Sequence, residues 1–210
     1  ELRLFYQPQI SLTSGRINGA EALIRWQHPE HGLLSPGEFV PIAEQSGLII
    51  PIGPWVIEEA CRTLAKWSKE LPGGDRFTMG INLSGKQLVK PTLIADIEAV
   101  LAETGVDPSH IEMEITESIL LDDVDRSILV LEKLKALGLK LSLDDFGTGY
   151  SSLTYLRSFP IDVVKIDRSF VDGIGSDRDN AAIVRSVIDL ATTLGLRCIA
   201  EGVETEADLA

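Results

Sequence analysis

Cysteine, histidine and long apolar runs are all scarce in this sequence. Its 210 residues include 2 cysteines and 3 histidines. Cys61 and Cys198 each lie in an apolar run, so we expect two buried thiols in a reducing compartment, with a disulfide as the alternative. No apolar run approaches the roughly 20 residues that span a bilayer, and no segment resembles a signal peptide. We therefore expect a cytoplasmic domain, free or part of a membrane-anchored protein, with no direct membrane contact through this segment.

Basic residues are also scarce relative to acidic residues. The chain carries 19 lysines and arginines against 32 acidic residues, which gives a formal net charge of -13. This excess of acid disfavours a nucleic-acid polymer as partner, because backbone phosphates are bound by basic side chains. A small anionic ligand remains open, because bound metal ions can reverse the local sign of a site.

Several common catalytic motifs are missing too. The sequence has no GxGxxG loop, no Walker loop and no residue pattern that indicates a Ser–His–acid triad. Asp145-Phe146-Gly147 matches the metal-binding triplet of kinases, but the glycine-rich loop and catalytic-loop signature that accompany it in kinases are missing. The chemistry therefore has to be sought among the acidic residues.

The second half of the sequence alternates short apolar runs with amphipathic segments. The expected strands are Phe77–Asn82, Ile111–Glu114, Leu139–Asp144, Ile161–Asp167 and Leu196–Glu201. Apolar residues recur at helical period over about Pro54–Glu70, and again from Ile183 to Leu194, where Gly195 provides a stop. Alternation at roughly 30 residues per unit predicts right-handed βαβ units and a parallel sheet. A doubly wound sheet and a barrel both fit this pattern.

The N-terminal part has a different pattern. Leu2–Tyr6 and Ile17–Ile24 are expected to be strands, and the short turn at Thr13-Ser14-Gly15 predicts that they pair antiparallel. The stretch from His28 to Pro36 is expected to be a loop rich in proline and glycine. No low-complexity linker interrupts the chain, so we expect a single domain over residues 1–210. About seven strands are expected where a closed barrel needs eight, so we expect a C-terminally incomplete domain from a longer multidomain protein.

Polar residues stand where the expected parallel strands end. These residues are Asn82, Glu114, Asp144 with Asp145, Lys165 with Asp167, and Glu201. Active sites of barrels are assembled at the carboxyl ends of the strands. An acid after a strand is often only the N-cap of the next helix, but five consecutive strands make that explanation insufficient. We therefore predict that these side chains converge on one functional site.

The convergence of several carboxylates has an electrostatic cost. Two carboxylates about 4 Å apart repel by roughly 4 kcal/mol at an effective dielectric constant near 20. A cluster of them must therefore protonate, separate or bind cations. Oxygen ligands, with an asparagine carbonyl among them, suit Mg²⁺, Mn²⁺ or Ca²⁺ better than zinc. Such a cation site beside a spare carboxylate and a lysine is typical of hydrolytic enzymes.

Seven short motifs run the length of the chain. They are Tyr6-Gln7-Pro8, Glu21-Ala22-Leu23-Ile24-Arg25-Trp26, Asn82-Leu83-Ser84, Glu114-Ile115-Thr116-Glu117, Asp144-Asp145-Phe146-Gly147-Thr148-Gly149-Tyr150-Ser151, Lys165-Ile166-Asp167 and Glu201-Gly202-Val203-Glu204. In this order and spacing they resemble the EAL family of cyclic di-GMP phosphodiesterases. One departure is that the family's Gln-Gly pair, on its last strand, lies beyond the end of this sequence.

The resemblance implies a TIM-like (β/α)8 barrel with an antiparallel first strand, here without its last strand and helix. It also implies hydrolysis of one phosphodiester of cyclic di-GMP to linear 5'-pGpG, which lowers the second messenger in bacterial signalling. The implied cofactors are a pair of Mg²⁺ or Mn²⁺ ions, with Ca²⁺ as an inhibitor. Paired ions bracket the attacked phosphorus and stabilise both the attacking and the leaving oxygen.

The resemblance also implies a role for each matched residue. The expected metal ligands are Glu21, Asn82, Glu114 and Asp144 for the first ion, Asp145 for the second, and Asp167 in the same neighbourhood. Lys165 is expected to orient the attacking water, and Glu201 to act as the general base. The expected substrate contacts are Gln7, Leu23 and Arg25, of which Arg25 binds phosphate. Glu117 is expected to support the loop from Asp145 to Ser152.

Two alternatives to an active phosphodiesterase stay open. One is a catalytically silent family member that binds cyclic di-GMP or a protein partner, although every acid of the pattern is present here. The other is an unrelated Mg²⁺ barrel acting on a sugar phosphate or an enolate, which explains the acids but not the series of motifs. The family further implies an ability to form a homodimer and a linkage to sensor or GGDEF domains.

Overall fold

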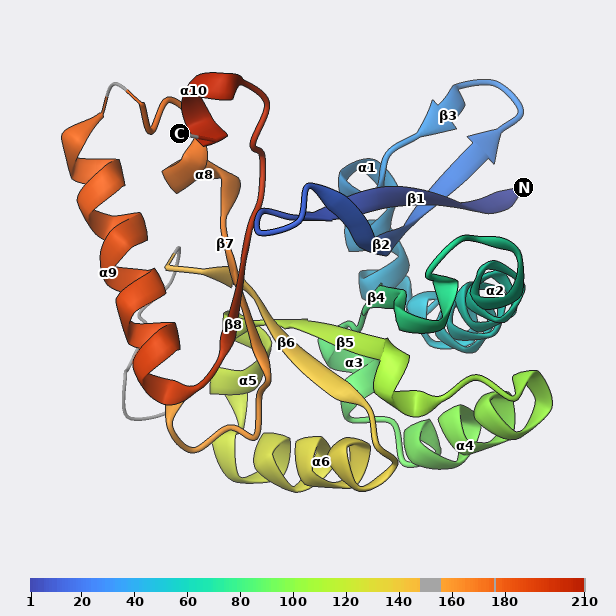
Figure 1. The fold of residues 1–210 in the computed structure, drawn as a ribbon. Coiled ribbons are helices and arrows are strands. Elements are labelled where there is room, and N and C mark those ends of the chain that lie inside the picture. Colours follow the sequence, from blue (N-terminus) through green and yellow to red (C-terminus); the bar gives the residue numbers. More distant parts are fainter. Residues whose placement is uncertain (148–155, 176, 210) are drawn as a thin grey trace. The chain divides into compact units, whose positions relative to one another are not determined.

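The computed structural model describes residues 1–147, 156–175 and 177–209, and the chain divides into two units (Figure 1). The first unit comprises Glu1–Met113 and Lys133–Lys140, and the second comprises Glu114–Glu132 and Leu141–Ala210. Among the described residues, no helix combines the length and the apolar character that a membrane span requires.

The strands of the first unit begin with a hairpin. β1 (Leu2–Ser11) and β2 (Arg16–His28) pair antiparallel, which confirms the predicted hairpin. β2 also pairs in parallel with β4 (Thr78–Asn82). The expected loop from His28 to Pro36 is wrong in part, because β3 (Gly32–Leu34) pairs antiparallel with β2. Gly32, at φ 75°, adopts the left-handed conformation that lets the chain reverse there.

Helices cover the strands of the first unit. They are α1 (Pro36–Ser46), α2 (Ile49–Glu70), α3 (Gly85–Leu88) and α4 (Leu93–Thr104), with 3-10 turns at Gly74–Arg76 and Pro108–His110. α2 begins at Ile49 rather than Pro54, because prolines in the first turns of a helix cost few hydrogen bonds. α1 and α3 bury too few side chains for an apolar period to predict them.

The face that α2 buries explains its stability. Its buried side chains from the middle of the helix onward are Ile57, Ala60, Cys61 and Leu64, at the spacing of one helical face. This face packs against β4 and α4. Full burial of a side chain such as Leu64, which is 2% exposed, contributes roughly 1.5–3 kcal/mol.

The second unit contains parallel strands with helices between them. β6 (Lys140–Phe146), β7 (Val163–Ile166) and β8 (Arg197–Ala200) pair in that order, and β5 (Ile111–Thr116) is divided between the two units. The helices are α5 (Glu117–Asp122), α6 (Val124–Ala136), which ends in the first unit, α8 (Arg168–Val171), α9 (Arg178–Leu194) and α10 (Glu206–Leu209). Gly195, at φ 73°, ends α9 as predicted.

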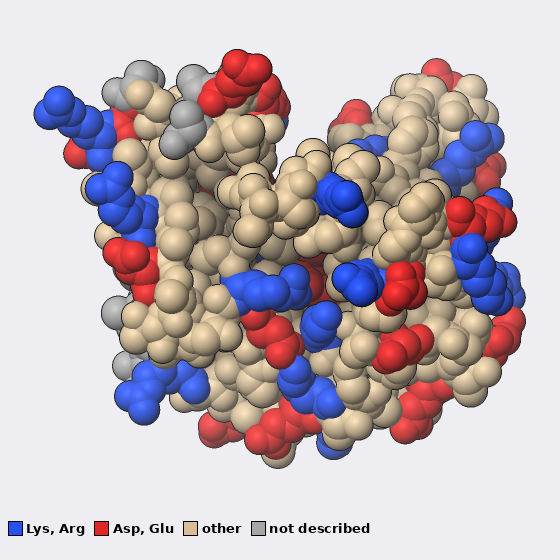
Figure 2. Space-filling model, viewed as in Figure 1, with Lys and Arg blue, Asp and Glu red and all other residues tan. Residues whose placement is uncertain are grey.

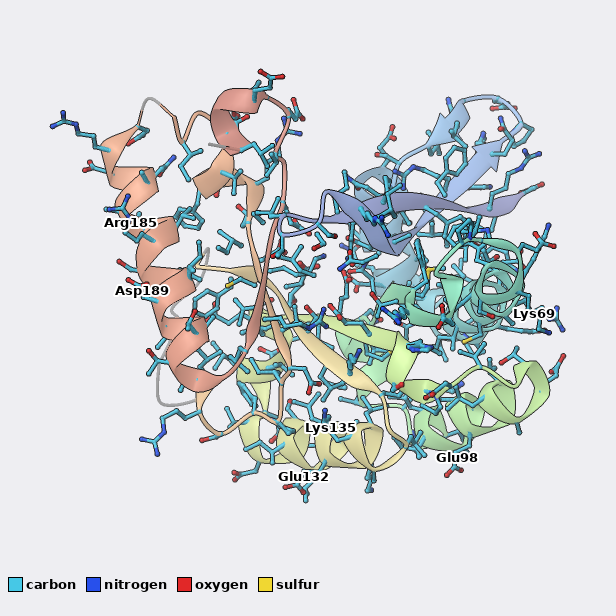
Figure 3. All side chains as sticks on the ribbon, in the orientation of Figure 1. Lys69, Glu98, Glu132, Lys135, Arg185 and Asp189 are labelled. Atoms are coloured by element: carbon cyan, nitrogen blue, oxygen red, sulfur yellow. The ribbon has the colours of Figure 1, made fainter. Side chains whose placement is uncertain are left out.

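α9 lies along β7 and β8 in the second unit (Figure 1). Val184 of α9 is buried against Ile166 of β7 and Val171 of α8. Arg185 and Asp189 are exposed and point away from the strands (Figure 3). Val184 and Val187 of the apolar stripe read from the sequence therefore pack toward the strands, whereas Ile183 and Ile188 of the same stripe are exposed.

The cysteines confirm one prediction and correct another. Neither cysteine is in a disulfide, and Cys61 on α2 is fully buried, which raises the pKa of its thiol to about 12. Cys198 on β8 is exposed, so the prediction of two buried thiols is wrong for this residue. Among the described strands β8 pairs only with β7, so it lies at an edge of the described sheet. Side chains on an edge strand remain accessible even where the sequence is apolar.

Charged side chains of both signs lie on the face drawn in Figure 2. On the face drawn in Figure 2, acidic and basic side chains lie next to one another, with apolar and uncharged residues between them. A mixed charged surface of this kind keeps a protein solvated, which accounts for charged residues that take no part in a site.

Candidate functional site

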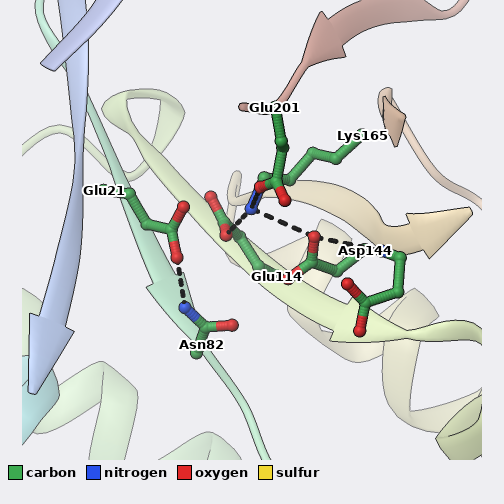
Figure 4. A network of polar contacts seen from close by, with 7 residues as sticks. Glu21, Asn82, Glu114, Asp144, Lys165 and Glu201 are labelled. Carbon is green, nitrogen blue, oxygen red and sulfur yellow. Dashed lines mark hydrogen bonds and ion pairs between the residues drawn. The ribbon is translucent and has the colours of Figure 1, made fainter. Parts of the chain in front are cut away.

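A buried lysine surrounded by carboxylates is the central feature of the second unit. Lys165 on β7 is 1% exposed, and its Nζ lies 2.6 Å from Glu114, 2.6 Å from Glu201 and 3.1 Å from Asp144 (Figure 4). These partners come from the ends of β5 and β6 and from the segment after β8. The predicted convergence of strand-end polar residues is therefore confirmed for these four residues.

The positive and negative charges of these four groups do not balance. If all are ionised, three carboxylates and one ammonium sum to -2, and Glu114 is only 1% exposed. Water cannot screen charges at such a depth as it does at a surface. The arrangement therefore favours either protonation of a carboxylate or the binding of a cation.

A local break in β6 brings a further carboxylate to the same place. Along a regular strand Asp144 and Asp145 would point to opposite faces. Asp145 instead has φ 54°, and the pairing of β6 with β7 shifts register between Leu143 and Phe146. Its backbone N–H donates to Asp144 Oδ1 at 3.1 Å. Asp145 is the only non-glycine residue with positive φ among the described residues, and such strain is concentrated at functional sites.

Three carboxylates of this unit could share one cation. Oxygen atoms of Asp144, Asp145 and Glu201 all lie within 4.8 Å of one another. Carboxylate oxygens at this spacing suit a hard divalent cation such as Mg²⁺, Mn²⁺ or Ca²⁺. The donor set therefore fits the expected kind of metal.

Two further predicted residues of the second unit have local structural contacts. Asp167 caps α8: its Oδ1 accepts from the Ser169 backbone N–H at 3.0 Å and also contacts the Ser169 hydroxyl. Ser169 was not predicted, although an Asp-x-Ser sequence before a helix is a recognisable cap. Glu117 is 7% exposed at the start of α5. Part of the loop that it was expected to support, residues 148–152, lies outside the described residues.

In the first unit, the structure joins two of the predicted metal ligands. Asn82 Nδ2 donates to Glu21 Oε1 at 2.7 Å (Figure 4). The parallel pairing of β2 with β4 places Glu21 opposite Gly80, so Asn82 follows two residues along the neighbouring strand. This hydrogen bond uses the Asn82 nitrogen, and the Asn82 carbonyl oxygen is the atom suited to a cation.

The three expected substrate contacts lie on the hairpin of the first unit. Gln7 on β1 is opposite Glu21 on β2 and is exposed. Leu23 and Arg25 follow Glu21 at alternate positions of β2, so they share its face. The Arg25 guanidinium donates to the Ile24 carbonyl at 2.9 Å and lies 5.8 Å from the centre of the Phe5 ring.

Parallel strands with an antiparallel first strand, and carboxylates gathered at the ends of the strands, define an α/β protein with an acidic site at the strand ends. The EAL domain model matches residues 1–210. The chain therefore belongs to the EAL-domain family, as its motifs indicated.

Named relatives agree with this assignment. The chain is 46% identical over 208 residues to the bifunctional diguanylate cyclase/cyclic di-GMP phosphodiesterase MucR of Pseudomonas aeruginosa, covering 99% of this chain and 30% of MucR. It is 41% identical over 210 residues to the cyclic di-GMP phosphodiesterase NbdA of the same species, covering 100% of this chain and 27% of NbdA. The chain thus spans less than a third of the length of either protein.

The fold agrees with solved structures. A structure of PaMucR phosphodiesterase in a c-di-GMP complex matches with a TM-score of 0.94 at 45% identity, covering 99% of this chain and 83% of that one. This match confirms the predicted α/β fold class.

Proposed function

We propose that this chain hydrolyses one phosphodiester of cyclic di-GMP to linear 5'-pGpG and that the reaction depends on Mg²⁺ or Mn²⁺. The observation that carries the proposal is the buried Lys165 with its three carboxylate partners, in a chain of the EAL family. MucR and NbdA, to which the chain is 46% and 41% identical over the matched regions, are named as cyclic di-GMP phosphodiesterases.

The donor set supports a divalent cation in this role. Asp144, Asp145 and Glu201 supply oxygen atoms within 4.8 Å of one another, and Glu114 adds a buried carboxylate beside Lys165. A bound cation would stabilise the negative charge that develops on the phosphate oxygens. We further propose Glu21, Asn82 and Asp167 as ligands, and a pair of ions in all, on the family pattern.

The chain's own residues account for the proton transfers. We assign Glu201 as the base that takes the proton from the attacking water, and the ion pair with Lys165 holds its carboxylate in position beforehand. The water oxygen then forms a bond to phosphorus, and the bond from phosphorus to the 3' oxygen breaks. The 3' oxygen takes a proton from solvent, Glu201 releases its proton to solvent, and the product keeps its phosphate on the 5' oxygen.

The remaining assignments follow the family pattern as proposals. Arg25 would pair with a ligand phosphate, and Gln7 and Leu23 would contact the dinucleotide. Ca²⁺ would inhibit by occupying the site without supporting turnover. The cytoplasmic location, the homodimer and the linkage to sensor or GGDEF domains belong to the whole protein, of which the relatives are longer examples.

The test is a direct assay of turnover. The chain is incubated with cyclic di-GMP and Mn²⁺ or Mg²⁺, and pGpG is separated by chromatography. Glu201→Gln and Glu114→Ala should each lower the rate by at least about a hundredfold, because each removes a base or a buried charge partner. Glu98→Gln is the matched control, since Glu98 is an exposed glutamate on α4 (Figure 3).

Two outcomes would contradict the proposal. Near-normal rates in Glu201→Gln or Glu114→Ala would contradict these roles. Tight binding of cyclic di-GMP without metal and without pGpG formation would instead favour the catalytically silent binding module.

A further inference from the structure

A buried glutamine links two elements of the first unit. Gln87 on α3 is 6% exposed, and a buried carboxamide is costly unless it is hydrogen-bonded. Its Oε1 accepts from the Ser84 backbone N–H at 2.7 Å, and its Nε2 donates to the Ile49 carbonyl at 3.3 Å. Ser84 Oγ in turn accepts from the Gln87 backbone N–H at 3.4 Å. The side chain therefore ties the chain at Ser84 to the first residue of α2.

A glycine on α2 makes room for this contact. A Cβ atom at Gly53 would lie 1.9 Å from Gln87 Nε2 and 2.9 Å from Gln87 Cδ, so a side chain there would force the Gln87 carboxamide to move from its present position. Glycine is disfavoured inside helices, so its presence here calls for a reason. The close approach of the Gln87 carboxamide supplies that reason, and it makes Gly53 and Gln87 a matched pair.

Ser84, the residue that Gln87 holds, lies two residues after Asn82, a proposed metal ligand. Asn82 ends β4, Leu83 follows as a buried residue at 4% exposure, and Ser84 is the residue that Gln87 holds. Asn82 is therefore fixed by β4 on one side and by Ser84 on the other. Its carboxamide donates to Glu21 at 2.7 Å, a contact that a shift of this short connection would lengthen.

We propose that Gln87, with the space provided by Gly53, is a positioning residue that sets the orientation of the Asn82 carboxamide for cation binding. It touches neither substrate nor metal and acts through the backbone at Ser84. The claim that Gln87 favours cation binding rests on the proposed function. The claim that Gln87 keeps the Asn82 carboxamide in its hydrogen bond to Glu21 does not depend on that function.

The test is a double-mutant cycle with two readouts. Gly53→Ala and Gln87→Ala are made singly and together in the same chain. The first readout is the chemical shift of the Asn82 side-chain NH₂ group in ¹⁵N NMR without metal, which reports its hydrogen bond to Glu21. The second is Mn²⁺ affinity by titration with Mn²⁺ alone, where loss of an outer contact typically costs roughly 10–100-fold.

We expect both single variants to shift the Asn82 NH₂ resonances and to weaken Mn²⁺ binding by about tenfold or more. Gly53→Ala should add no further loss in the Gln87→Ala background, because the clashing carboxamide is gone. Gly37→Ala is the control, since a Cβ at Gly37 on α1 meets nothing within 4 Å. A merely structural role would lower the unfolding temperature without moving the Asn82 resonances.

Two results would overturn the inference. One is an Asn82 NH₂ signal that stays unchanged in both single variants. The other is a Gly53→Ala variant that binds Mn²⁺ as well as Gly37→Ala does. A wild-type chain that binds no Mn²⁺ would contradict the proposed function and the metal part together, whereas the NMR readout would still decide whether Gln87 orients Asn82.

Discussion

Replacement of Lys165 by methionine would remove the only ammonium among three carboxylates while keeping a long apolar stem in the same space. Lys165 Nζ lies 2.6–3.1 Å from Glu114, Asp144 and Glu201, and the lysine is 1% exposed. The substitution therefore leaves an acidic cluster whose deepest member, Glu114, is 1% exposed and cannot be stabilised by solvent in place of the missing charge.

The size of the effect follows from the charges. Removal of one partner from a buried ion pair costs about 3–5 kcal/mol, and two bare carboxylates about 4 Å apart repel by roughly 4 kcal/mol at an effective dielectric constant near 20. Because relaxation and protonation relieve part of this repulsion, we expect Lys165→Met to lower the free energy of unfolding by about 3–5 kcal/mol in the absence of metal. A domain of ordinary stability has only about 5–15 kcal/mol in total.

Urea unfolding with a chelator present measures this change. Mn²⁺ should reduce the deficit of Lys165→Met, because a cation restores positive charge beside Asp144. Lys69→Met is the control, since Lys69 is exposed at the end of α2 (Figure 3).

The reasoning would be refuted if Lys165→Met were as stable as Lys69→Met in chelator, with the same dependence on urea. Such a result would mean that the cluster loses its ammonium group without cost to the fold. A deficit that Mn²⁺ leaves unchanged would refute the cation part alone.

Two further predictions concern a glycine and the cysteines. Gly202→Ala should lower the free energy of unfolding by at least about 1 kcal/mol more than Gly15→Ala does. Both glycines have positive φ, of 72° and 65°, so the backbone strain is similar in the two variants. A Cβ at Gly202 would lie 2.4 Å from Arg168 Cγ, whereas a Cβ at Gly15 meets nothing within 4 Å. Equal unfolding midpoints in urea would contradict this. Iodoacetamide at pH 8 should modify Cys198 in the folded protein and Cys61 only after unfolding, as mass spectrometry would show. Burial raises the pKa of Cys61 from 9.0 to about 12, so the folded protein holds the thiol proton more tightly than the unfolded chain does. This contribution to the free energy of unfolding is present below pH 9 and is lost as pH rises toward 12.

Much of the architecture could be predicted from local pattern. The strands from β4 to β8 and the helices α2 and α9 follow from alternating apolar runs, helical stripes and a glycine stop. α1, α3 and β3 could not be predicted, because short elements that bury few side chains leave no readable period.

The site could be predicted only in outline. Strand-end positions indicated that Glu114, Asp144, Lys165 and Glu201 would meet, and the structure confirms this. Regular strand alternation would place Asp145 on the face opposite to Asp144. Asp145 joins the site only because β6 has a local irregularity in its backbone, which the sequence does not reveal. Gln87 could not be singled out either, because its importance arises from its approach to Gly53, a contact between residues distant in sequence.

The most direct test of the account is a crystal structure of the chain with cyclic di-GMP and Ca²⁺, a cation expected to bind without turnover. The account predicts Ca²⁺ at about 2.3–2.6 Å from carboxylate oxygens of Asp144 and Asp145, with a phosphate of the dinucleotide on the same cation. Bound cyclic di-GMP with no cation at these carboxylates would contradict it.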